Sequence, residues 1–225
     1  MREGVKVNVR KRVRYAVGRA VLSSLGWQVE GSVPDAPRFV LLAAPHTTWW
    51  DLPIALGVGY VMDLDIVWVG KHTLFEGPFG GFMRWLGGVP VDRRSSHNYV
   101  QQISELIHSR DRIMLMIAPE GTRGVTSYWK SGFYWIAHTA QVPIVCAFLD
   151  YRRKRGGLGP TITTTGDPRA DMAQIRAFYA TVTAKHPERF QNVRLREEDA
   201  PPAPPPSEGA EGDDASPLRP LVPAE

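Results

Sequence analysis

Short apolar runs alternate with segments of helical periodicity along this 225-residue chain, and this alternation most strongly limits its fold. The runs are rich in Val, Ile and Leu and end near Pro, Gly or Asp, as buried strands do. We expect strands at 39–44, 65–69, 89–92, 113–118, 143–149 and 161–165. We expect helices at 52–62, 98–109, 132–139 and 170–184, with short helices within 74–86. This order predicts an α/β fold, a three-layer αβα domain with a mixed, mostly parallel sheet.

A separate helix is predicted at the N-terminus, over residues 9–25. Its apolar residues recur every four positions: Val9, Val13, Val17, Val21 and Leu25. Residues 1–20 carry a net charge of +6, although the whole chain carries only +4. A basic amphipathic helix of this kind suits an anionic membrane surface. Packing on its own domain with a solvated basic face is the alternative.

The C-terminal end has a different composition. Residues 200–225 contain eight prolines among 26 positions, few large apolar residues and a net charge of −4. Such a segment buries too little apolar surface to fold, so we expect it to be disordered. The predicted organisation is a basic amphipathic segment over 1–30, a folded domain over 31–190 and an acidic, Pro-rich disordered tail over 191–225.

Composition excludes several classes of protein. The single cysteine, Cys146, rules out an intramolecular disulfide and a cysteine metal cage. The positive charge is concentrated at the N-terminus, which disfavours an evenly basic nucleic-acid-binding surface. No apolar run has the length of a transmembrane helix, and no apolar core of a signal peptide follows the basic start. We therefore expect a cytoplasmic location, with peripheral association at the inner membrane face.

Polar side chains follow three of the predicted strands, at the sheet edge where α/β proteins bind ligands. His46 and Asp51 come after the strand at 39–44, as a general base and its orienting carboxylate would. Residues 119–123 read Pro-Glu-Gly-Thr-Arg, and residues 89–93 end in an arginine suited to phosphate. Taken singly, these blocks also fit a loop histidine, a helix-starting aspartate, surface salt bridges and turns.

Together the blocks resemble the lysophosphatidic acid and glycerolipid acyltransferase family. That family carries four motifs in a fixed order. The first is His-x4-Asp, the second ends in Arg, the third is Pro-Glu-Gly-Thr-Arg, and the fourth is a strand containing Val-Pro-Ile. The chain has all four in this order, the last at 142–145. The resemblance spans about residues 37–183. Pro45 and Cys146 depart from the family pattern, which often has Asn or His at the first position and a second proline at the other.

The resemblance implies transfer of a fatty acyl group from an acyl thioester to a hydroxyl of lysophosphatidic acid or a related lysophospholipid. It implies His46 as general base, Asp51 as its partner, and no metal. It implies no cofactor besides acyl-CoA or acyl-ACP as co-substrate. Because the acceptor is amphiphilic, it favours the membrane-binding interpretation of the N-terminal helix. The alternatives are another acceptor (an ornithine lipid, a glycolipid or glycerol 3-phosphate) and a non-catalytic, membrane-associated lipid-binding protein.

The resemblance also implies a substrate site made of the following residues: Lys71, Arg93, Glu120, Gly121, Thr122 and Arg123. Arg93 would bind the acceptor phosphate, Glu120 would orient the acceptor's hydroxyl or glycerol part, and Arg123 would add charge or hold its loop. Amide groups near Gly121 would bind the oxyanion of the tetrahedral intermediate. Lys71, just after the strand at 65–69, joins the phosphate site or is an ordinary exposed lysine.

Two bulky residues, Trp49 and Trp50, stand between the predicted base and its carboxylate partner. They either shape an acyl pocket or touch lipid, or they pack in the core. The sequence supports these interpretations equally.

Overall fold

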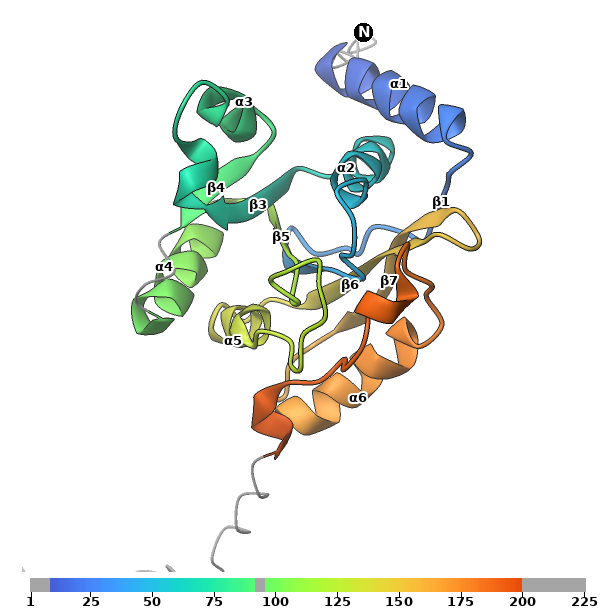
Figure 1. The fold of residues 1–225 in the computed structure, drawn as a ribbon. Coiled ribbons are helices and arrows are strands. Elements are labelled where there is room, and N and C mark those ends of the chain that lie inside the picture. The colour runs from blue at the N-terminus through green and yellow to red at the C-terminus, as the bar shows by residue number, and fades with distance from the viewer. Residues whose placement is uncertain (1–8, 92–95, 200–225) are drawn as a thin grey trace, which may run out of the picture.

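The computed structural model describes residues 9–91 and 96–199, and within them the chain forms a seven-stranded sheet (Figure 1). The strands are β1 (Gln28–Glu30), β2 (Arg38–Ala43), β3 (Ile66–Lys71), β4 (Gly88–Val91), β5 (Ile113–Ile117), β6 (Ile144–Asp150) and β7 (Arg155–Ile162). Their order across the sheet is β1-β7-β6-β2-β5-β3-β4. Only the β6–β7 pair is antiparallel within this described sheet. The predicted mixed, mostly parallel sheet is therefore confirmed.

The helices also follow the predicted order. They are α1 (Val9–Ser24), α2 (Asp51–Val61), α3 (Gly80–Trp85), α4 (Ser96–His108), α5 (Gly132–Thr139) and α6 (Pro168–Tyr179), with 3-10 turns η1 (His72–Phe75), η2 (Pro187–Arg189) and η3 (Arg196–Asp199). The α6 helix begins where the Asp167 side chain accepts hydrogen bonds from the amides of Arg169 and Ala170. It ends at Tyr179, so the predicted extension to residue 184 is wrong.

The strand assignments differ from prediction at one edge of the sheet. The predicted strand at 161–165 overlaps only the last two residues of β7, and β1 was not predicted. Gly156 and Gly157 weaken the apolar pattern that identifies a strand. Yet Gly157 is needed there, because a Cβ atom at this position would lie 1.7 Å from the Glu30 carbonyl oxygen of β1. The glycines explain the error at β7, whereas β1 reads Gln-Val-Glu and is too short and polar to show a strand pattern.

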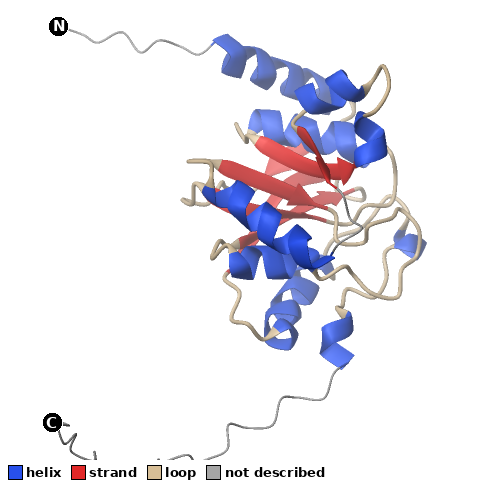
Figure 2. Cartoon of the chain, turned by 90° about the vertical axis from the view of Figure 1, so that its left-hand side faces the viewer, coloured by secondary structure: helices blue, strands red, loops and turns tan. Residues whose placement is uncertain are grey.

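The sheet lies between two helical layers (Figures 1 and 2). Helices α4, α5 and α6 cover one side, which we call the filled face, and α2 covers the other, which we call the cavity face. Residues of β2 alternate between the two sides, with Val40 and Leu42 in the cluster of the filled face and Phe39 and Leu41 in that of the other. The predicted three-layer αβα architecture is confirmed.

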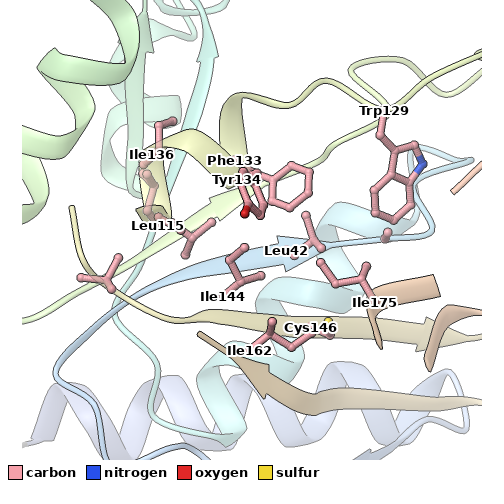
Figure 3. Packing of buried hydrophobic residues seen from close by; sticks show 14 of the residues in the cluster. Leu42, Leu115, Trp129, Phe133, Tyr134, Ile136, Ile144, Cys146, Ile162 and Ile175 are labelled. Atoms are coloured by element: carbon pink, nitrogen blue, oxygen red, sulfur yellow. The ribbon is translucent and has the colours of Figure 1, made fainter. Parts of the chain in front are cut away.

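The filled face holds the larger core, part of which is shown in Figure 3. Trp129, Tyr179 and Phe190 form edge-on and tilted aromatic contacts there. Leu195 is fully buried in the same cluster, and the Trp129 amide donates to the Arg194 carbonyl oxygen at 2.9 Å. The predicted start of the tail at residue 191 is therefore too early. Residues 200–225 lie outside the described residues.

Helix α1 packs on α2 rather than on the sheet (Figure 1). Gly18 permits this close approach, since a Cβ atom there would lie 2.7 Å from the Gly57 carbonyl oxygen of α2. Leu22 is buried on the same side, and Arg14 bonds to Asp65. No helix in the described part of the chain is long and apolar enough to cross a membrane.

The first part of the apolar stripe of α1 is exposed, whereas Val21 is half-buried and Leu25 packs in the cluster that contains Leu22. Val9, Val13 and Val17 are 71%, 55% and 48% exposed, and Arg12 and Arg19 are exposed as well. Helix α1 therefore packs on its own domain and leaves basic residues exposed, as the alternative interpretation expects, and its binding to a membrane stays a prediction. The glycine side of the helix contacts the domain, and the first three valines remain uncovered by the described residues.

Candidate active site

The predicted pair of His46 and Asp51 is in contact. His46 lies in the loop after β2, Asp51 is the first residue of α2, and His46 Nδ1 lies 3.1 Å from Asp51 Oδ2. Thr47 and Thr48 also donate their amide hydrogens to Oδ2, at 2.8 and 2.9 Å. The carboxylate thus binds amides of the loop that precedes α2.

The surroundings of Asp51 favour its charged form. Burial by itself would raise the pKa of Asp51, but hydrogen bonds from His46, Tyr151 and Thr48 outweigh burial and lower this pKa. An ionised carboxylate can only accept, so Nδ1 of His46 donates to it. In the neutral imidazole, Nε2 then carries a free lone pair. This arrangement can take a proton from a bound hydroxyl group.

Glu120 follows β5 and lies beneath the His46 loop. Its Oε1 accepts a hydrogen bond from the His46 amide at 2.9 Å, while its Oε2 is buried without a hydrogen-bond partner among the residues that the structure describes. Burial raises the pKa of this carboxyl group to about 7. The observed contact of Glu120 is therefore with the backbone that carries His46.

The rest of the 119–123 block forms an exposed loop beside this pair. Gly121 has a φ of 64°, in the left-handed region, and its amide donates to the Ala118 carbonyl oxygen at 3.3 Å. The Thr122 hydroxyl accepts from the Gly124 amide at 3.2 Å. The amides of Gly121 and Gly124 therefore form hydrogen bonds within the loop itself.

Arg123 leaves this loop toward the histidine loop. Its guanidinium carbon lies 3.4 Å from the centre of the Trp49 ring, a cation–π contact between the two predicted blocks. Trp49 and Trp50 are 72% and 59% exposed, so the core-packing interpretation of these residues is wrong.

The two predicted phosphate-binding residues are only partly visible. Lys71 is the last residue of β3, and its backbone pairs with Val91 at the end of β4. Arg93 lies outside the described residues. The strand register therefore places Lys71 beside Val91, which precedes Arg93 by two residues in the sequence.

A cavity of about 460 Å³ extends from this site between the sheet and α2. His46, Asp51, Trp49 and Arg123 contribute to its wall. The rest of the wall is mainly small or apolar: Leu41, Ala43, Ala44, Pro45, Leu52, Ala55, Val58, Gly59, Leu64, Ile66, Trp68, Val69, Met83, Met116, Ala118, Ala147, Phe148, Leu149, Gly157 and Leu158. A cavity of this volume and composition suits an alkyl chain. The sequence offered an acyl pocket as one interpretation of Trp49 and Trp50, and Trp49 lies in this wall, but the other apolar residues of the wall were not predicted.

Two further features concern possible chemistry at other groups. Cys146 is fully buried in the core of the filled face, and burial raises the pKa of its thiol to about 12, which disfavours the nucleophilic thiolate. Over residues 9–91 and 96–199, the structure has no group of three or more His, Cys, Asp or Glu side chains arranged to hold a metal ion.

Comparison with known proteins identifies the family of this chain. The sequence model of the family described as Acyltransferase matches residues 28–149. The chain belongs to this acyltransferase family. The matched region contains His46, Asp51 and the 119–123 loop, and it ends within β6.

Two curated relatives carry the name 1-acyl-sn-glycerol-3-phosphate acyltransferase. The one from Streptococcus pneumoniae is 28% identical over 144 residues, which cover 60% of this chain and 53% of the relative. The one from Haemophilus influenzae is 29% identical over 131 residues, which cover 53% of this chain and 52% of the relative. The chain thus spans about half the length of the curated relatives that it matches.

A solved structure shares the fold. It is the crystal structure of the 1-acyl-sn-glycerophosphate (LPA) acyltransferase PlsC from Thermotoga maritima, with a TM-score of 0.51 and 17% sequence identity. The superposition covers 80% of this chain and 86% of that one. The α/β arrangement described above is therefore shared with an acyltransferase structure.

Proposed function

We propose that this acyltransferase-family protein transfers a fatty acyl group from an acyl thioester to a hydroxyl group of lysophosphatidic acid or a related lysophospholipid. The observation that carries the proposal is that the His46–Asp51 pair lies in the wall of an apolar cavity. A base without an apolar pocket would suit many polar substrates. The names of the two curated relatives support lysophosphatidic acid as the acceptor.

The proposed reaction is a direct attack by the acceptor hydroxyl. His46 Nε2 removes the hydroxyl proton as the oxygen bonds to the thioester carbonyl carbon, and Asp51 stabilises the resulting imidazolium. The tetrahedral intermediate then collapses, the C–S bond breaks, and the thiolate leaves with the proton returned by His46. Because the acceptor itself is the nucleophile, the reaction needs no covalent acyl-enzyme intermediate.

The substrates would be held by groups around the pair. The acyl chain would occupy the apolar cavity, and Lys71, Arg93 and Arg123 would bind phosphate groups. Glu120 would orient the glycerol part through Oε2. Amides of the 121–123 loop would bind the oxyanion after a local rearrangement, since the Gly121 amide now donates to Ala118. The donor would be acyl-CoA or acyl-ACP, with no other cofactor.

The acceptor resides in membranes, and we propose that α1 binds the protein peripherally to the inner membrane face. Val9, Val13 and Val17 are exposed along α1, and Arg12 and Arg19 are exposed on the same helix. An apolar stripe with cations beside it suits the boundary between acyl chains and anionic headgroups. Three aromatic residues of the α3 region, Phe79, Phe82 and Trp85, are also more than half exposed.

Lipid mass spectrometry tests the reaction. Purified full-length protein is mixed with lysophosphatidic acid and palmitoyl-CoA or palmitoyl-ACP, beside a His46→Ala variant. Phosphatidic acid is expected from the native protein, with a loss of roughly 10²- to 10⁴-fold in the variant. Equal product from both proteins contradicts the assigned base. If lysophosphatidic acid gives no product with any donor, but ornithine lipid, a glycolipid or glycerol 3-phosphate is acylated, the proposed acceptor is wrong.

Vesicle flotation tests the membrane proposal. Val13→Asp should weaken binding to anionic vesicles several-fold, because a carboxylate would enter the apolar stripe among anionic headgroups. The free energy of unfolding should change by less than about 0.5 kcal/mol, since Val13 is exposed. Val33→Asp, at an exposed valine outside α1, is the matched control. Equal losses in both variants contradict binding through α1.

A further inference from the structure

We infer that Tyr151 is a positioning residue that holds Asp51 in the orientation required by His46. This inference rests on the proposed acyl transfer. The Tyr151 hydroxyl donates to Asp51 Oδ1 at 2.6 Å, although the two residues are 100 positions apart. Tyr151 directly follows β6, whose first two residues, Ile144 and Val145, belong to the fourth motif block. The end of that strand therefore reaches the base pair through a residue that the motif does not include.

The hydrogen bonds of Asp51 show why this contact matters. Three donors bind Oδ2: His46 Nδ1 and the amides of Thr47 and Thr48. The Tyr151 hydroxyl is the donor that the described residues supply to Oδ1. The carboxylate is only 5% exposed, so without Tyr151 a charged oxygen would be buried and unsatisfied. Rotation of the carboxylate to recover a partner for Oδ1 would disturb the bond to His46.

Tyr151 is itself held in place by its surroundings. Its amide donates to the Thr183 carbonyl oxygen at 2.9 Å. Its ring packs edge-on against Trp27 with 4.9 Å between ring centres, and Lys185 Nζ lies 5.6 Å from the ring centre. A tyrosine held at its backbone and its ring presents its hydroxyl in one direction at little entropic cost. Burial, and next the Asp51 carboxylate, raise the pKa of Tyr151, which keeps the hydroxyl protonated as a donor.

Tyr151→Phe is the first variant, because it removes the hydroxyl and keeps the ring. We expect kcat to fall roughly 10- to 100-fold, the loss that corresponds to a hydrogen bond to a charged group, with KM for both substrates unchanged. The matched control is Tyr134→Phe, which removes a 2.8 Å bond from a tyrosine hydroxyl to the buried Asp171, away from the site. An equal loss of kcat in the control would show a general structural effect and overturn the inference.

A double-mutant cycle tests whether Tyr151 acts through Asp51. In an Asp51→Asn background, Tyr151→Phe should lower kcat by less than about two-fold further. A full additional loss in that background means that Tyr151 acts elsewhere, and the inference fails. It also fails if Tyr151→Phe alone leaves kcat within about two-fold of the native value.

A spectroscopic measurement without substrate separates this inference from the proposed reaction. The proton of His46 Nδ1 in its bond to Asp51 should give a low-field ¹H NMR signal that is absent in His46→Ala. Tyr151→Phe should shift or broaden this signal, whereas Tyr134→Phe should not. If the native protein transfers no acyl group, the reaction is wrong, and the NMR signal still decides the positioning role. An unmoved signal in Tyr151→Phe overturns it.

Discussion

The two faces of the sheet are packed in different ways, although the same strands supply both. On the filled face, Phe133, Tyr134 and Ile136 of α5 are fully buried in one cluster with Leu42 and Leu115 (Figure 3). On the cavity face, several small residues such as Ala55, Gly59 and Ala147 line the wall among larger apolar ones, and about 460 Å³ remains. Close packing is what stabilises a core, so an unfilled apolar volume costs stability. The comparison indicates that the fold is stabilised mainly from one face and that the other is kept for a ligand.

Truncation on the filled face should have the largest effect on stability. Phe133→Ala removes a fully buried ring, and we expect the free energy of unfolding to fall by about 3–5 kcal/mol. The activity of the remaining folded protein should be unchanged, because Phe133 does not line the cavity. Urea denaturation measures the free energy of unfolding. Single-time-point assays of the folded protein measure its activity. A loss below 1 kcal/mol would mean that the two faces do not differ in this way.

The two faces also differ in how completely their buried carboxyl groups are hydrogen-bonded. On the filled face, both oxygens of Asp171 are bonded, by the Tyr134 hydroxyl and by the amide and hydroxyl of Thr165. Near the cavity, Glu120 Oε2 has no partner in the described residues. Burial raises the Glu120 pKa from its ordinary value of 4.5 to about 7. Between these pH values the folded chain keeps a proton that the unfolded chain loses, so stability should fall as pH rises.

Glu120→Gln tests this pH dependence. The amide oxygen of glutamine can still accept from the His46 amide, but it carries no charge. The variant should gain up to about 3 kcal/mol relative to the native protein between pH 4 and pH 8, the free energy of the pKa difference. Unfolding midpoints measured in urea across this range check the prediction. Parallel pH curves for both proteins would show that Glu120 titrates normally.

A larger side chain should affect the two faces differently, and these effects are the smallest that we expect. Ala137 is fully buried on the filled face, so Ala137→Leu should cost about 1–3 kcal/mol by overpacking. Ala147 lines the cavity, so Ala147→Leu should change stability by less than about 1 kcal/mol. It should instead lower the rate with long acyl chains relative to short ones, as competition assays with mixed acyl thioesters would show. An unchanged chain-length preference would indicate that the acyl chain binds elsewhere.

Much of this protein was determined by local sequence. The alternation of apolar and helical segments predicted the layers and nearly all elements, because each strand and helix carries its own periodicity. The order and spacing of the motif blocks predicted the contact between His46 and Asp51, since both residues belong to one strand–loop–helix unit. Errors arose at β7, where glycines needed for close pairing of strands hide the strand pattern, and at β1, which has only three residues and one apolar side chain.

The remaining features were decided only by tertiary structure. The periodicity of α1 defines its apolar stripe, but contact with Gly57 decides that the glycine side packs and the valines stay exposed. Tyr151 follows a different strand from His46, and no local pattern relates it to Asp51. The cavity depends on small residues that meet across several elements. Sequence patterns report what neighbouring residues do together, whereas these contacts join segments that only the folded chain brings side by side.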